Sequence, residues 1–152
     1  MAEALARITE LTDLGMIQIR ADLDRAGDAI AGAAGLAVPA RTSATADGSR
    51  TLLWMSPDEL LLVLPRAETA GALTALTDAL ATEHSLVLDV SDMRAAFAVE
   101  GPKAEQVLMK LFPADIASMP DDGVRRTRAA QVACALWRHG DGWRVIAFRS
   151  IR

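Results

Sequence analysis

The chain has 152 residues, 51% of them hydrophobic, a formal net charge of −4 and a single cysteine. This length fits one domain or two small lobes that share a core, and the acidic balance argues against general nucleic-acid binding. No apolar run approaches the ~20 residues that a membrane span needs. No secretory signal is visible at the N-terminus, and one cysteine fits a reducing compartment. We therefore expect a cytoplasmic protein.

The first part of the chain alternates between strand and helix patterns. The expected elements, in chain order, are a strand at 16–20, a helix at 22–35, a loop at 38–50, strands at 51–55 and 59–64, a helix at 66–82 and a strand at 86–90. Asp22 is a suitable N-cap and Gly35 a suitable stop for the first helix. The order βαββαβ is typical of a ferredoxin-like split βαβ unit.

The hairpin at 51–64 turns at Pro57 and Asp58, because proline sets the φ of a type I turn and aspartate bonds nearby backbone groups. Its second strand alternates, which predicts that Leu62 faces the core, with Leu61 as the alternative inward residue. The inward residues expected on the helix at 66–82 are Ala70, Leu73, Leu76 and Leu80.

The pattern then begins again. A strand at 95–100, a helix from 104, a loop at 112–123 and a long hairpin of strands 128–138 and 143–148 are expected. This is a second, incomplete β-α-β-β unit, and the fold class is α+β. We expect a single domain, 1–152, made of a lobe at 14–91 and a lobe at 92–152. Trp137 and Trp143 flank the second hairpin turn, which predicts a cross-strand aromatic pair.

Two segments resemble one known family. The first is Trp-Met-Ser-Pro-Asp-Glu at 54–59 with the apolar strand after it, and the second is Asp-Val-Ser-Asp-Met-Arg-Ala-Ala at 89–96, which leads into Gly101-Pro102. Together they resemble the gamma subunit of heterotetrameric sarcosine oxidase, over about residues 14–150. The resemblance implies a fold similar to the folate-binding domain of aminomethyltransferases of the glycine-cleavage T-protein type. It also implies an amphipathic C-terminal helix, of which residues 149–152 match only the opening.

The resemblance implies a function as well. The complex of that family oxidises sarcosine to glycine, and the methyl carbon passes to tetrahydrofolate or leaves as formaldehyde. Flavins, NAD and tetrahydrofolate are expected on larger flavoprotein subunits, with no cofactor on this chain, which would be a non-catalytic structural subunit. Two alternatives stay open: a stand-alone folate-binding aminomethyltransferase-like protein and a small-ligand-binding module of ferredoxin-like fold.

The residues themselves predict no catalytic, cofactor-binding or metal site. His84, His139 and Cys134 lack metal-ligand spacing, and Cys134 is expected to be a buried small hydrophobe. Asp89, Ser91 and Asp92 follow a strand and are expected to bond the local backbone. The glycines at 27–35 lack the Lys-Ser/Thr of a phosphate-binding loop and lie in a helix.

The densest basic cluster is Arg125, Arg126 and Arg128, at the entry to a predicted strand. Arginines there protect an exposed strand edge against aggregation, and a docking patch for a partner is the functional alternative. Residues 1–100 hold 7 Lys and Arg against 15 Asp and Glu, whereas residues 101–152 hold 9 against 5. This asymmetry fits a subunit that docks on charged partners, and it also fits ordinary solvated faces.

Overall fold

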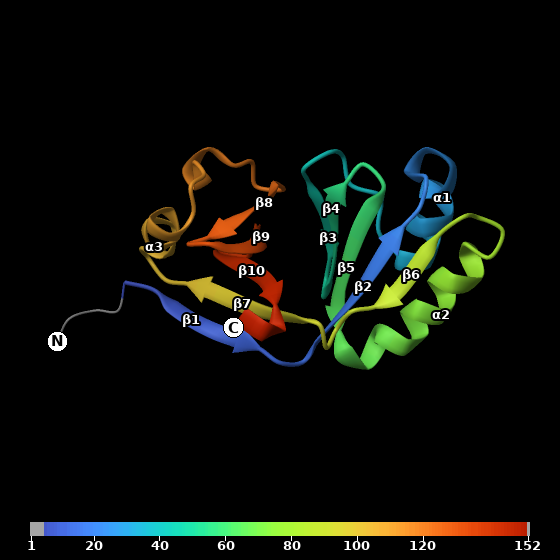
Figure 1. Ribbon diagram of the computed structural model, residues 1–152, viewed down its shortest axis with the longest axis horizontal. Helices are drawn as coiled ribbons and strands as arrows, with labels where there is room; N and C mark the ends of the chain where they lie inside the picture. The colour runs from blue at the N-terminus through green and yellow to red at the C-terminus, as the bar shows by residue number, and fades with distance from the viewer. Residues whose placement is uncertain (1–4, 152) are drawn as a thin grey trace. The chain divides into compact units, whose positions relative to one another are not determined.

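The computed structural model describes residues 5–151, which form two compact units (Figure 1). Residues 13–92 make the first, here named the central unit. Residues 93–151 together with residues 5–12 make the second, here named the terminal unit, because it takes both ends of the described chain. Each unit has its own five-stranded antiparallel sheet. Arg152, part of the predicted opening of a C-terminal helix, lies outside the described residues.

The central unit has the ferredoxin-like order that the sequence predicts. Its elements are β2 (Leu14–Arg20), α1 (Leu23–Ala34), β3 (Ala44–Asp47), β4 (Arg50–Ser56), β5 (Glu59–Pro65), the 3-10 helix η1 (Arg66–Glu68), α2 (Thr69–Ala79) and β6 (Leu86–Asp89). The sheet order is β3-β4-β5-β2-β6. Strand β2 therefore lies between β5 and β6, and each helix connects two strands that are not neighbours, which is the split βαβ arrangement.

The terminal unit is the second, incomplete unit, with strands that the sequence did not reveal. Its elements are β1 (Arg7–Leu11), β7 (Arg94–Glu100), α3 (Ala104–Leu111), the 3-10 helix η2 (Ile116–Ser118), β8 (Val124–Ala129), β9 (Val132–His139), β10 (Gly142–Phe148) and the 3-10 helix η3 (Arg149–Ile151). The sheet order is β1-β7-β10-β9-β8.

Local chemistry explains the bounds of the first helix. The Asp22 carboxylate accepts hydrogen bonds from the backbone N–H groups of Asp24 and Arg25, at 3.1 and 3.4 Å. Gly35 ends the helix at a φ of 75°, a conformation that glycine adopts without steric cost, and its N–H donates to the Ala31 carbonyl. Both predicted caps are confirmed.

The second helix differs from its prediction in extent and in phase. It begins at Thr69 after one 3-10 turn and ends at Ala79, so the expected span 66–82 is too long. Ala70, predicted to face inward, is exposed, and Thr69 and Ala72 are buried instead. The 3-10 turn winds three residues per turn, which moves the apolar stripe away from the phase of a continuous α-helix. Leu76 and Leu80 are buried, as expected.

The core of the central unit lies between its helices and one face of the sheet. Leu60, Leu62 and Leu64 of β5 pack there with Ile17 and Ile19 of β2, all fully buried. This confirms Leu62 as a residue of the helix-covered face. Leu61 is equally buried, on the opposite face of the sheet. The alternation of β5 therefore predicts correctly which residues share a face, although both faces are apolar.

Four sequence interpretations are wrong in detail. The expected loop at 38–50 contains the edge strand β3, and the strand β1 was not expected. The expected strand 128–138 is two strands, since the chain turns at Ala130, which has a φ of 56°. The turn at Gly140 and Asp141 pairs Arg138 with Trp143 and Trp137 with Arg144. The two tryptophans therefore lie on opposite faces, and the predicted aromatic pair does not form.

Candidate functional site

The three arginines predicted to dock a partner lie on the outermost strand of the terminal unit. Strand β8 is at the edge of its sheet, and Arg125, Arg126 and Arg128 are all exposed. Because side chains alternate along a strand, Arg126 and Arg128 share one face while Arg125 lies on the other. The structure therefore brings two of the three guanidinium groups to one face and separates the third.

The polar residues Asp89, Ser91 and Asp92 at the end of β6 make structural hydrogen bonds and ion pairs, as the sequence predicts. The Asp89 carboxylate accepts from both the N–H and the hydroxyl of Ser91, at 2.9 and 2.5 Å. The Ser91 hydroxyl oxygen in turn accepts from the Met16 N–H at 2.9 Å. Asp92 pairs with Arg66, with Nη2 and Oδ1 3.1 Å apart. Ser91 thus links the end of β6 to β2, and its hydroxyl is buried and bonded to Asp89 and to the Met16 backbone.

Cys134 and the two histidines remain separate. Cys134 is buried among the apolar residues between α3 and the sheet of the terminal unit, and burial raises the pKa of its thiol, so it stays protonated. Burial, with a smaller contribution from the Arg144 charge, lowers the pKa of His139. Among the residues that the structure describes, no group of three or more His, Cys, Asp or Glu side chains could hold a metal ion.

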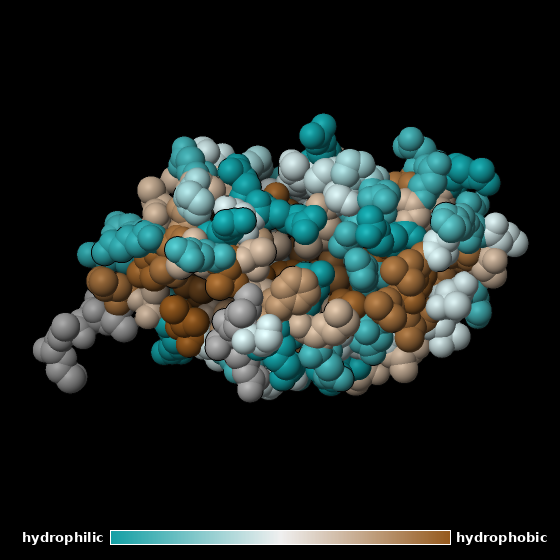
Figure 2. Space-filling view, viewed as in Figure 1, coloured by the Kyte–Doolittle hydropathy of each residue, from teal (hydrophilic) through white to brown (hydrophobic). Residues whose placement is uncertain are grey.

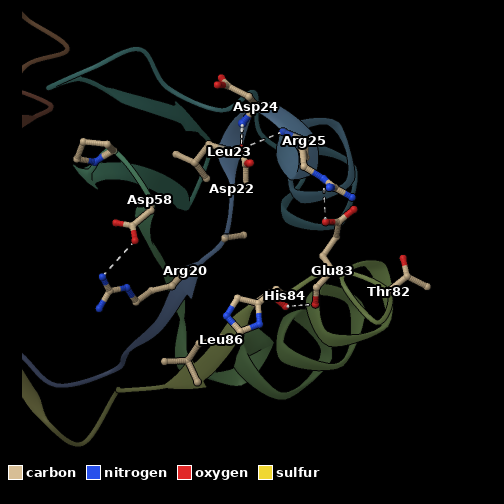
Figure 3. Close-up of a pocket in the computed structure, with 13 residues that line it drawn as sticks. Arg20, Asp22, Leu23, Asp24, Arg25, Asp58, Thr82, Glu83, His84 and Leu86 are labelled. Carbon is tan, nitrogen blue, oxygen red and sulfur yellow. Dashed lines mark hydrogen bonds and ion pairs between the residues drawn. The ribbon is translucent and has the colours of Figure 1, made fainter.

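An open pocket of about 980 Å³ lies in the central unit (Figure 3). The end of β2, the start of α1, the turn between β4 and β5, and the segment between α2 and β6 line it. These lining residues are Arg20, Ala21, Asp22, Leu23, Asp24, Arg25, Pro57, Asp58, Thr82, Glu83, His84, Ser85 and Leu86. The sequence predicts Asp22 as a cap and Pro57 and Asp58 as a turn. It does not predict that they lie together, because only the folded sheet places the segments around 22, 58 and 84 side by side.

Ion pairs occupy both arginines of the pocket. Arg20 Nη2 lies 3.3 Å from Asp58 Oδ2, and Arg25 Nε lies 3.6 Å from Glu83 Oε2, with His84 between the two pairs in Figure 3. The Ser56 hydroxyl, which donates to the Asp58 carboxylate, and Arg20 lower the pKa of Asp58. The pocket therefore carries four carboxylates against two guanidinium groups, a lining that suits a cationic or zwitterionic group better than an anion.

The fold of the chain is similar to that of a solved aminomethyltransferase. The chain superposes on the crystal structure of glycine cleavage system aminomethyltransferase T from Bartonella henselae with a TM-score of 0.71, over 93% of this chain and 42% of that one. The sequences are 13% identical, so this likeness shows the fold alone. The chain thus has the α+β fold of the aminomethyltransferase class, as the sequence predicts.

Closer relatives then define the family. Residues 20–152 match the model of the sarcosine oxidase, gamma subunit family, and the chain belongs to that family. It is 36% identical to sarcosine oxidase subunit gamma of Corynebacterium sp. strain U-96, over 95% of this chain and 71% of the relative. It is 32% identical to the same subunit of an Arthrobacter species, over 96% of this chain and 78% of that relative.

A solved structure of this family has the same fold in detail. The chain superposes with a TM-score of 0.88 on a chain of heterotetrameric sarcosine oxidase from Corynebacterium sp. U-96, solved in complex with pyrrole 2-carboxylate. The match covers 96% of this chain and 77% of the other, at 31% sequence identity. The resemblance stated from the two sequence segments is therefore confirmed.

Proposed function

We propose that this chain is a non-catalytic structural subunit of a heterotetrameric sarcosine oxidase complex, which oxidatively demethylates sarcosine to glycine. The observation that carries this proposal is the match to the gamma subunit family over residues 20–152. The likeness to a chain of a heterotetrameric sarcosine oxidase, at a TM-score of 0.88, supports it. We propose that residues 1–152 act as a single domain within this complex.

The chemistry of the described residues supports a structural role. Ser91 is buried with its hydroxyl bonded to Asp89 and to the Met16 N–H, and Cys134 is buried with the pKa of its thiol raised, so neither is an accessible nucleophile. We propose that flavins, NAD and tetrahydrofolate reside on the larger flavoprotein subunits and that the complex works in the cytoplasm. Among residues 5–151, the structure contains no helix long and apolar enough to cross a membrane.

The test is reconstitution. The large subunits are produced with and without this chain, and peroxide formation from sarcosine is measured in the purified product, together with the amount of this chain that co-purifies. We expect the chain to co-purify in fixed stoichiometry and the isolated chain to produce no peroxide with sarcosine and added FAD. Peroxide formation in proportion to the isolated chain would overturn the non-catalytic role. Failure of the wild-type chain to co-purify would overturn the assembly itself.

We propose further that the arginines of β8 help to dock a large subunit by steering association toward carboxylates. Exposed ion pairs contribute up to ~1 kcal/mol each, so the informative variant is the triple reversal Arg125→Glu, Arg126→Glu and Arg128→Glu. The matched control reverses Arg41, Lys103 and Arg149, three exposed cations outside β8, with the same change in net charge. We expect only the β8 variant to lose complex at low salt. Equal yields for both variants would reduce β8 to a protected strand edge.

The alternative function, a folate-binding or small-ligand-binding module, has the pocket around Asp22 and His84 as its supporting observation. Calorimetric titration of the isolated chain with tetrahydrofolate and with sarcosine tests this alternative. Saturable binding that Asp58→Asn weakens would favour it, because Asp58 lines the pocket and pairs with Arg20 there.

A further inference from the structure

The four edges of the two sheets differ in how they are protected. An open strand edge invites pairing with another chain unless charges or short length discourage it. Strand β8 carries three arginines, β1 carries Arg7 and Glu10, and β3 has four residues and ends in Asp47, opposite Arg50. Strand β6, with the sequence Leu-Val-Leu-Asp, is as short as β3 and also ends in an aspartate, but it carries two exposed leucines. Its edge is therefore the most apolar of the four.

The exposed leucines of β6 lie on the face away from the helices. Val87 packs against the core beneath α1 and α2, so its neighbours Leu86 and Leu88 point to the opposite face, where they are 47% and 43% exposed. Figure 2 shows hydrophobic surface where β6 lies in Figure 1. Two large apolar side chains spaced two residues apart match the side-chain repeat of an incoming strand.

The backbone of β6 also has groups that face outward. The Val90 N–H donates to the Met16 carbonyl at 2.9 Å, which makes these two residues a hydrogen-bonded pair. In an antiparallel ladder such pairs alternate with non-bonded ones. By the register of β2 and β6, Val87 and Asp89 are then the non-bonded residues. Their N–H and C=O groups point away from β2, toward the open edge.

The charge of the central unit favours a basic strand at the open edge of β6. The central unit holds 12 Asp and Glu against 5 Lys and Arg, so its field attracts a basic segment and opposes a second copy of itself. We propose that the outer edge of β6 accepts an extended, basic segment of a large partner subunit as a sixth strand. Alternate apolar side chains of that segment would cover Leu86 and Leu88. The identity of the partner rests on the proposed function.

Two kinds of variant break this contact without removing a ladder bond to β2. Val87→Pro deletes an outward N–H at a position where an edge strand tolerates proline. The double change Leu86→Ser and Leu88→Ser removes the apolar match from exposed positions. Its control is Met109→Ser with Leu111→Ser, two residues on α3 that are 49% and 44% exposed.

The experiment measures the dissociation constant of the full chain from the large subunits, and amide hydrogen exchange of the free and the assembled chain. We expect at least a tenfold weaker complex for both β6 variants and less than a twofold change for the α3 control. Assembly should protect the amides of Val87 and Asp89. Wild-type affinity in both β6 variants, with unchanged exchange at Val87, would overturn the edge proposal and leave the subunit role intact.

A second arm does not depend on the complex. The isolated chain is titrated with a ten-residue peptide of alternating Lys and Val, and with the matched peptide of alternating Glu and Val, while amide chemical shifts are recorded. We expect shifts along β6 with the basic peptide only. Shifts with neither peptide, where the wild-type chain also fails to join the large subunits, would overturn both proposals. Dimerisation of the isolated chain that Val87→Pro abolishes would make a second copy the occupant.

Discussion

The two units repeat one strand order and differ in one helix. In the central unit the sheet runs β3-β4-β5-β2-β6, and in the terminal unit it runs β8-β9-β10-β7-β1. Strand β2 corresponds to β7, α1 to α3, and β5 to β10. In the central unit η1 leads from β5 into α2, which then leads to β6. In the terminal unit η3 follows β10, and among residues 5–151 no second helix follows it.

The position beside β7 is filled from the other end of the chain. Strand β1 pairs with β7 in the place that β6 takes beside β2. Within residues 5–151, β1 therefore completes the strand order without a second helix. In the central unit, α2 contacts both β2 and β6.

The helix-covered faces of the two sheets differ in how deeply their residues are buried. Ile17 of β2 and Leu62 of β5 are fully buried. Phe97 and Val145, at the matching positions of β7 and β10, are only half-buried, and Ile8 of β1 is 60% exposed. Because apolar area removed from water stabilises a fold in proportion to that area, the central unit should hold the larger share of the stability.

The largest expected effect comes from shortening a fully buried side chain in the core of the central unit. Leu62→Ala leaves a cavity in a fully buried site and should cost ~2–5 kcal/mol of unfolding free energy. The matched change Val145→Ala, on the half-buried face of the terminal unit, should cost about 1 kcal/mol, because less area was removed from water. Urea unfolding of both variants measures the difference. Equal losses of unfolding free energy in the two variants would show that the core of the terminal unit is as well buried as that of the central unit.

The next effect tests the strand that completes the terminal unit. Gly101 has a φ of 125°, and a Cβ there would lie 3.0 Å from the Ala6 Cα and 3.2 Å from the Leu5 carbonyl oxygen. Gly101→Ala should therefore cost ~1–3 kcal/mol and loosen β1, which faster amide exchange at residues 7–11 would report. Gly32→Ala, in open space on α1, is the control and should stabilise slightly. Unchanged exchange in β1 would mean that its docking does not depend on this close approach.

The sequence revealed the parts that carry local signals. The cap and stop of α1, the turn at Pro57 and the alternation of β5 each follow from nearby residues. Strand β1 carries no such signal, since Arg-Ile-Thr-Glu-Leu is mostly exposed and its partner β7 lies about ninety residues away. The turn between β8 and β9 was hidden for another reason. Ala130 adopts a positive φ without the glycine or asparagine that normally announces one.

The candidate site was only partly visible in the sequence. The family match followed from two short segments, and the arginines of β8 are exposed as a docking patch requires. Which of those arginines share a face depended on the exact bounds of β8. The pocket depended on three turns that only the sheet brings together, and the open edge of β6 depended on strand order. Long-range pairing of this kind leaves no local pattern to read.

A smaller effect compares one ion pair in each unit. Arg50 of β4 pairs with Glu68 at 3.0 Å and donates to the Ala34 carbonyl, while Arg138 of β9 pairs with Glu105 at 3.3 Å. The Arg138 guanidinium also lies 4.4 Å from the centre of the Trp143 ring. Replacing either arginine by Met should cost about 1 kcal/mol. In 1 M salt we expect the Arg50→Met loss to shrink more, because ring contact is screened less than an ion pair. An identical salt dependence of the Arg50→Met and Arg138→Met losses would show that the Trp143 ring does not stabilise Arg138.

The smallest effect is a pH dependence confined to the terminal unit. Burial first, and the charge of Arg144 second, lower the pKa of His139, while Glu100 opposes them. The unfolded histidine titrates near ~6.5, so between the folded and unfolded values the unfolded chain binds more protons. The stability linked to neutral His139 is therefore fully present above about pH 6.5. It declines as the pH falls from the unfolded pKa of this histidine toward its lower folded pKa. His139→Gln should flatten this decline in urea midpoints measured between pH 5 and 8, whereas His84→Gln, in the central unit, serves as the control. A decline unchanged by His139→Gln would assign the acid sensitivity to carboxylates instead.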